Sequence, residues 1–155
     1  MNSIIWSALL SMTPVGELRV GIPFALASGL SPWTAFLACV IANIIIVPIC
    51  FLFLELIHTK LLHVNSYQSV FDKFMEKTRK KVQPLVEKYG MFGLAAFVAV
   101  PIPGTGAYTG ALAAWFLGMN KWKAFISIAI GVVAAGAIML GVLLGGIKLV
   151  GLVTA

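Results

Sequence analysis

The sequence predicts an all-α integral membrane protein built as an inverted repeat. Each repeat is a re-entrant helical hairpin plus a transmembrane helix, and an amphipathic interfacial helix lies between the repeats. Of the 155 residues, 61% are apolar and 10% are charged, which is too little polar surface for a soluble globule. The chain also matches itself at an offset of 89 residues, with 10 identities over the 41 positions from Pro14 to Leu54. A duplicated apolar chain is typical of transporters, whose sites lie where the repeats meet.

The first repeat is expected to occupy residues 1–58. Its apolar region 3–30 is interrupted by Pro14-Val15-Gly16-Glu17, which leaves two arms of about half a membrane thickness each. Proline removes a backbone donor and glycine weakens a helix, so we expect a hairpin of two short helices here. The segment 32–57 then exceeds the roughly 20 apolar residues that a spanning helix needs.

The second repeat, residues 90–155, has the same plan. The predicted hairpin 91–119 is broken at Pro101-Ile102-Pro103-Gly104-Thr105-Gly106, and residues 123–147 form the second transmembrane helix. Gly131, Ala135, Gly136, Gly141 and Gly145 give this helix a small-residue face, with Gly141 and Gly145 at GxxxG spacing. That face either packs against a hairpin of the same chain or forms a dimer seam, and the small size of the bundle favours a homodimer.

Residues 59–89 form a basic connecting segment. Seven basic and three acidic residues lie between Lys60 and Lys88, while apolar residues recur at helical spacing over 66–89. This pattern predicts an amphipathic helix on the cytoplasmic interface, bent near Pro84 and in contact with anionic membrane lipids. The alternative is a solvated basic linker. We expect no nucleic-acid partner, because no recognition motif accompanies the charge.

The broken regions leave two topologies open. If both cross the bilayer, the chain has four spans, and Lys121 and Lys123 lie on the face opposite the basic segment. If both turn back, these lysines join that segment on one side, as the positive-inside rule favours. We therefore expect a multi-pass protein of the cytoplasmic membrane with both termini outside and the middle segment in the cytoplasm. One crossing then separates equivalent positions, so the repeats are inverted.

Glu17 and Arg19 are the only charged residues among the first 54. At the bilayer centre an ionisable side chain costs at least about 2.5 kcal/mol, which calls for a partner, water or a function. Residues two apart on a helix point to nearly opposite sides, so we expect each to face a different lobe of one cavity. The alternative is a purely structural role, in which the two charges neutralise one another or cap the hairpin.

The second break offers backbone groups instead of charge. Its glycines expose N–H groups, and a helix begins there with its positive dipole end at the break. Together with Arg19, this favours an anion such as a phosphate or carboxylate, unless the motif serves only to turn the chain. The candidate residues at this tip are Pro103, Gly104, Thr105, Gly106 and Tyr108, and the Thr105 hydroxyl is expected to cap the helix or touch the ligand.

Two further residues complete the candidate site. Poor hydration favours the protonated form of a carboxyl group, so Glu17 suggests proton coupling; for a cationic substrate it would be the direct counter-ion. Asn43, in the middle of the first spanning segment, either satisfies backbone groups or bridges to a hairpin, or else contacts substrate.

The residues Pro14, Glu17-Leu18-Arg19 and Pro23, followed by the motif from Pro101 to Ala111, resemble the family named putative small multidrug export proteins. More distantly the chain is similar to the DedA, or SNARE-associated (VTT), superfamily, whose members are thought to have paired re-entrant hairpins and to move lipids such as polyprenyl-phosphate carriers. That likeness implies an acidic residue at one tip, matched by Glu17. It also implies basic residues at the second tip, where Ala107 and Tyr108 are uncharged.

We therefore expect a membrane transporter or flippase, proton-coupled, for an amphipathic substrate with an anionic head group such as a polyprenyl phosphate. The alternatives are a small exporter of lipophilic cations and a non-transporting protein that shapes lipid or scaffolds a partner. We expect the protein to have no enzymatic activity and to bind no cofactor or metal, because the chain has no Ser/His/Asp set and no metal-binding Cys/His spacing.

Overall fold

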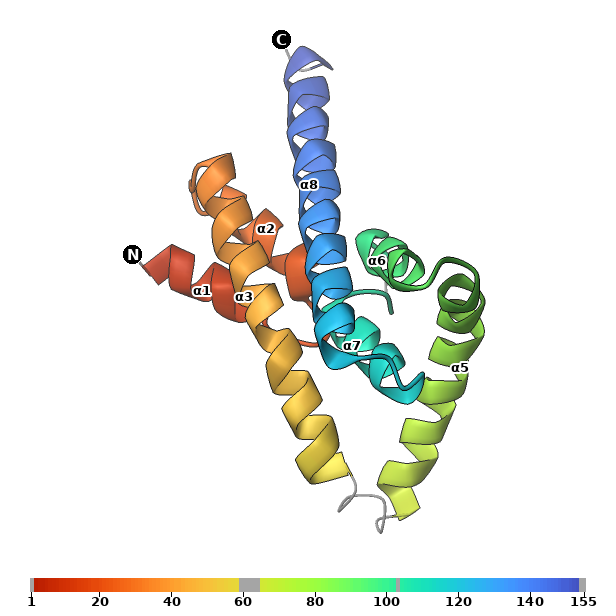
Figure 1. Cartoon of the computed structure of the whole chain (residues 1–155). Helices are drawn as coiled ribbons and strands as arrows, with labels where there is room; N and C mark the ends of the chain where they lie inside the picture. The colour runs from red at the N-terminus through yellow and green to blue at the C-terminus, as the bar shows by residue number, and fades with distance from the viewer. Residues whose placement is uncertain (1, 59–64, 103, 154–155) are drawn as a thin grey trace.

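The protein is all-helical over the residues that the computed structural model describes, 2–58, 65–102 and 104–153 (Figure 1). No strand occurs within these ranges, which confirms the predicted all-α class. The elements are α1 (Asn2–Ser11), α2 (Glu17–Ala27), α3 (Pro32–Phe53), a π-helical turn η1 (Leu54–His58), α5 (Asn65–Tyr89), α6 (Met91–Ala99), α7 (Ala107–Phe116) and α8 (Lys121–Val153).

The two long apolar helices expected from the sequence are α3 and α8. Over Pro32–Leu56 and Lys121–Gly146 they are long and apolar enough to cross a membrane. Both begin at a capped end. The Ser31 hydroxyl accepts a hydrogen bond from the Thr34 N–H at 3.3 Å, and Asn120 Oδ1 accepts one from the Trp122 N–H at 3.0 Å. Such caps satisfy backbone donors that the first turn leaves unpaired.

Each interrupted region folds into two short helices in contact with one another. A methyl group at Gly21 of α2 would lie 1.8 Å from Ser11 Oγ and 2.9 Å from the Ser7 carbonyl oxygen of α1. In one continuous helix, residues 7 and 21 would be about 21 Å apart, so the chain turns back on itself. In the second region, Gly110 of α7 faces Val98 of α6 in the same way, at 2.7 Å.

The two halves pack by corresponding contacts. In the first half, α1 and α2 both contact α3; in the second, α6 and α7 both contact α8. The halves are joined because α3 packs on α8 and on α7, while α2 packs on α8. The centre of the resulting core is fully buried and apolar, and includes Ile22, Cys39, Val47, Leu94 and Ile128. The buried ends of the two chain breaks, Gly16–Glu17 and Thr105–Gly106, adjoin this core.

Helix α5 lies on one flank, against α6 and α7 (Figure 1). It begins one residue before the predicted 66–89 and ends at Tyr89; the preceding residues 59–64 lie outside the described ranges. A methyl group at Gly93 would lie 2.0 Å from the Leu85 carbonyl oxygen, so α5 and α6 are in close contact. The Arg79 guanidinium also lies 5.4 Å from the centre of the Phe116 ring of α7.

The turn after α3 and the start of α8 lie at the same end of the molecule. Lys121 forms an ion pair with Glu55. Figure 1 shows α3 running toward this end and α8 running away from it, with the beginning of α5 also near the end of α3. The two long helices are therefore antiparallel, and Lys121, Lys123 and the start of α5 gather at one end.

Candidate functional site

The carboxylate of Glu17 lies at the N-terminus of α7. Glu17 is the first residue of α2, is 8% exposed, and accepts a hydrogen bond on Oε1 from the Tyr108 backbone N–H at 3.4 Å. No side chain caps α7 at its own N-cap residue, Gly106. Free N–H groups and the helix dipole make this end attractive to an anion. The Glu17 side chain thus occupies the position at this helix end that an anion would take.

Glycine at position 106 allows this approach. A methyl group there would lie 1.9 Å from Glu17 Oε2 and 2.6 Å from the carboxylate carbon, and the φ angle of Gly106 is 141°. Both the contact and the backbone conformation exclude a larger residue. Glu17 and Gly106 are also 89 residues apart, so positions that correspond in the two repeats touch one another.

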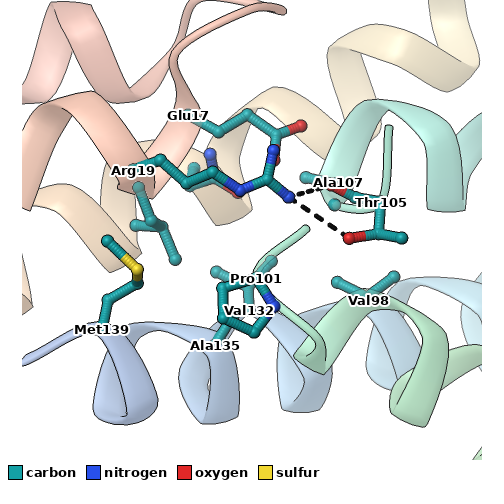
Figure 2. Close-up of a pocket in the computed structure, with 12 residues that line it drawn as sticks. Glu17, Arg19, Val98, Pro101, Thr105, Ala107, Val132, Ala135 and Met139 are labelled. Atoms are coloured by element: carbon teal, nitrogen blue, oxygen red, sulfur yellow. Dashed lines mark hydrogen bonds between the residues drawn. The ribbon is translucent and has the colours of Figure 1, made fainter. Parts of the chain in front are cut away.

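Arg19 extends from the first break to the second (Figure 2). Its Nη2 donates hydrogen bonds to the Thr105 carbonyl oxygen at 2.8 Å, to Thr105 Oγ1 at 3.2 Å, and to the Ile102 carbonyl oxygen. The Thr105 hydroxyl in turn donates to the Val100 carbonyl oxygen at 2.5 Å. Thr105 therefore does not cap α7, one of the two roles expected for it. It closes the turn after α6 and accepts hydrogen bonds from Arg19.

Asn43 connects α3 to the first hairpin. It is 1% exposed, and its Nδ2 donates to the Ser11 carbonyl oxygen at 2.7 Å. Its Oδ1 has no hydrogen-bond partner within the described part of the chain, and neither has Arg19 Nε. A buried polar atom without a partner is costly. These two atoms are the groups at the centre that remain available to a water molecule or a ligand.

A small cavity lies between these groups (Figure 2). The volume open to the centre of a water molecule is about 20 Å³, which is room for about one water. Glu17, Arg19 and Asn43 line it together with Thr105 and Gly106, and its apolar wall comes from Val98, Val132, Ala135 and Met139. The charged centre therefore has room for little more than one water molecule in this conformation, because its own side chains fill it.

The other predicted residues lie close by or outside the described ranges. The Tyr108 hydroxyl donates to the Met12 carbonyl oxygen, which adds a second contact between α7 and the first break. Gly104 has a φ angle of 84° and open space beside it. Pro103 lies outside the described residues. No group of three His, Cys, Asp or Glu residues able to hold a metal occurs in the described part of the chain.

The cavity wall that α8 contributes was not predicted from the sequence. The repeat register contained a signal for it, since Val132, Ala135 and Met139 stand 89 residues after Asn43, Ile46 and Cys50. Apolar residues in an apolar helix do not stand out individually, so the correspondence of Val132 with Asn43 is the signal for this wall.

Two antiparallel membrane-capable helices, packed on two broken helical pairs with a charged centre, define a small helical membrane protein. The family model described as "Putative small multi-drug export protein" matches residues 17–138. The chain therefore belongs to this family, and the match includes Glu17, Arg19, Asn43, Thr105, Gly106 and Tyr108 of the candidate site. No curated protein and no solved structure matches the chain.

Proposed function

We propose that the protein is a proton-coupled membrane transporter of amphipathic molecules, and that the proton and an anionic head group use the same centre. One observation carries this proposal: the Glu17 carboxylate occupies the N-terminus of α7, where an anionic substrate would bind. The family to which the chain belongs is described as one of small multi-drug export proteins.

Protonation of Glu17 is the step that opens the site. A neutral carboxyl group loses most of its attraction to the helix dipole, so the N–H groups of α7 become free for another anion. Arg19 then leaves the centre with one positive charge, which a head group such as a phosphate monoester balances. Because uncompensated charge is expensive inside the membrane, the proton and the anion bind together. Polyprenyl phosphates are one example of this substrate class.

A second candidate substrate is a lipophilic cation, for which deprotonated Glu17 is the counter-ion. The contacts of Arg19 support this alternative. Its Nη2 already donates to the carbonyl oxygens of Ile102 and Thr105, so this group is not free to bind an anionic substrate. A cation that competes with protons for Glu17 would be exchanged for them. Such an exchange lets an inward proton gradient drive export of the cation. Export is the activity that the family description names.

We further propose that both broken pairs are re-entrant hairpins of an inverted repeat. Three features support this proposal: the fold-back of α1 onto α2, the corresponding contacts of the two halves, and the antiparallel α3 and α8. Residues near a two-fold axis meet their own equivalents, as Glu17 meets Gly106. In this arrangement the ion-bearing tips lie near the bilayer midplane.

The basic face of α5 is proposed to rest on anionic lipids of the cytoplasmic leaflet. Lys77, Arg79, Lys80 and Lys81 are exposed there, and each basic residue near such a surface contributes about 1 kcal/mol of attraction. If the protein were instead a lipid-shaping scaffold, reversing these four charges would abolish its function, while Glu17 and Arg19 would be dispensable.

The Glu17→Gln variant tests the two substrates against each other, because glutamine resembles the protonated carboxyl group. We expect purified Glu17→Gln protein to bind butyl phosphate at every pH, whereas the parent binds it more tightly as the pH falls. Butyltrimethylammonium should lose affinity in the same variant if the substrate is a cation. Glu87→Gln on exposed α5 is the matched control. Transport by folded, inserted Glu17→Gln and Arg19→Ala variants at the parent rate would disprove the mechanism.

A further inference from the structure

A second, apolar pocket adjoins the charged centre. Its volume is about 540 Å³, within the range of about 300 to 1,000 Å³ that is usual for small-molecule sites. It lies between the second half of α3, the first break and α7. None of its lining residues is charged, so it suits a hydrocarbon or aromatic group. We call it the apolar groove.

One wall of the groove is a single stripe of α3 that continues into the first residue of η1. The lining residues Ile46, Ile49, Cys50, Phe53 and Leu54 recur every three or four residues, which places them on one helix face. The stripe is about 12 Å long at 1.5 Å per residue. Asn43, three residues before Ile46, continues the same face up to the charged centre. The groove therefore starts where the polar cavity ends.

The opposite wall connects the groove directly to Glu17. Pro14 of the first break, with Tyr108, Thr109 and Leu112 of α7, completes the lining. Tyr108 belongs to both sites, because its backbone N–H donates to Glu17 while the residue lines the groove. A molecule with a polar end beside Glu17 can thus extend its apolar body past Tyr108 toward the groove.

The groove is also partly open to the surroundings. Ile49 is 48% exposed and Phe53 is 42% exposed, whereas Leu112 and Ile46 are buried. Burying apolar surface is favourable at these exposed side chains. The volume fits a body of drug size. These properties point to a compact amphiphile.

We propose that the apolar groove binds the apolar body of a compact amphiphile whose polar head lies at the charged centre. This inference rests on the proposed function and adds the size and shape of the substrate to it. It applies to an anionic and to a cationic head group alike. Bulk membrane lipid is the competing occupant.

The test compares probes that differ only in their apolar part. Methyl phosphate and tetramethylammonium report on the charged centre, while butyl phosphate and butyltrimethylammonium also reach the groove. Each methylene group taken from water strengthens binding about fourfold, so three partly buried ones should give an advantage of at least about tenfold to the butyl probe of the preferred charge. Binding is measured by ligand-observed NMR on the full chain in nanodiscs.

Ile49→Trp and Leu112→Trp fill the groove from opposite walls. We expect each to remove the butyl advantage and to leave methyl-probe binding unchanged. Ile45→Trp is the matched control, because Ile45 is a half-exposed residue of α3 that does not line the groove. Since two variants act from different helices, misfolding of one does not decide the result; retained methyl-probe binding shows that each is folded.

The outcomes separate the groove from the charged centre. A butyl advantage that survives both tryptophan variants, or that is absent in the parent, overturns the groove and leaves the centre intact. A butyl advantage that requires the groove but does not respond to Glu17→Gln or Arg19→Ala supports the groove and contradicts the proposed function. If no probe binds to the parent, both proposals are wrong.

Discussion

Glu17 combines three features that few residues share. Its φ angle is 46°, a left-handed conformation that costs a residue other than glycine about 1 to 3 kcal/mol. It is buried, and its carboxylate contacts the first residues of another helix. Backbone strain of this kind persists only where the surroundings hold it in place, and it concentrates at functional sites. The strain is therefore evidence for a functional role of Glu17, and this evidence does not depend on the charge of the side chain.

The contact between Glu17 and Gly106 can be measured as a double-mutant cycle. Gly106→Ala should destabilise the protein by about 2 to 4 kcal/mol, because the new methyl group meets both the carboxylate and an unfavourable φ. In a Glu17→Ala background the collision disappears and only the backbone strain remains, so the cost should fall by about 1 to 3 kcal/mol. Equilibrium unfolding in mixed micelles provides the measurement.

Gly104→Ala is the matched control for this cycle. Gly104 also has a positive φ, of 84°, but has open space where a methyl group would lie. Its cost should be the same with and without Glu17. Equal costs of Gly106→Ala in both backgrounds would mean that the carboxylate does not pack on Gly106.

At the scale of the elements, the two repeats share their connections. Gly29 and Gly118 follow α2 and α7 with φ angles of 80° and 63°, which only glycine adopts at little cost. Two residues later, Ser31 and Asn120 cap α3 and α8. These positions are 89 residues apart. The glycine and the capping residue of each repeat therefore form the same turn from a short helix into a long one.

The glycines of α8 divide between two environments. A methyl group at Gly131 would lie 2.6 Å from Val98 Cβ, and one at Gly136 would lie 2.8 Å from Val40 Cγ2, so these two pack inside the chain. Gly141 and Gly145 have open space beside them, and α8 projects beyond the other helices in Figure 1. The expected packing of the small-residue face on a hairpin of the same chain is therefore found at Gly131, against α6, whereas Gly141 and Gly145 contact no hairpin within the described residues.

The remaining expectation for Gly141 and Gly145 is a homodimer seam. Glycines four residues apart let two membrane helices approach closely, so Gly141→Leu with Gly145→Leu should shift the protein from dimer to monomer in nondenaturing detergent without unfolding it. Gly131→Leu should instead destabilise the monomer, since Gly131 is packed. Light scattering distinguishes the two results. A parent that is already monomeric in lipid nanodiscs contradicts the seam.

At the scale of the whole molecule, charge is distributed along the proposed membrane normal. The ion pair of Lys121 with Glu55 links the ends of α8 and α3, and the basic helix α5 begins near the same end. The positive-inside rule assigns this end to the cytoplasm. The antiparallel long helices thus match the topology that the lysines favour.

Cysteine accessibility tests this topology. In a chain without Cys39 and Cys50, single cysteines at Lys81 and Lys123 should react with an impermeant maleimide from the cytoplasmic side, and a cysteine at Asn2 from the outside. All three positions are exposed in the folded chain, so slow labelling through burial is avoided. Labelling of positions 81 and 123 from opposite sides would mean that residues 91–119 cross the membrane, which would exclude a re-entrant second hairpin.

The sequence by itself determined the helical class, the two long apolar helices, both breaks and the candidate residues Glu17 and Arg19. It could do so because hydrophobic length, proline and glycine act locally, and because the duplicated register shows each feature twice. Charged residues in an apolar chain are also conspicuous without any structure.

Only the tertiary structure decided which partners those residues have. Glu17 contacts the start of α7, and Arg19 donates hydrogen bonds to the carbonyl oxygens of Ile102 and Thr105. The apolar groove lies beside Tyr108. Each of these features joins segments that are far apart in the chain, about 90 residues for the two contacts. Such contacts depend on how helices pack, and the apolar side chains that direct packing are too alike in sequence to reveal it.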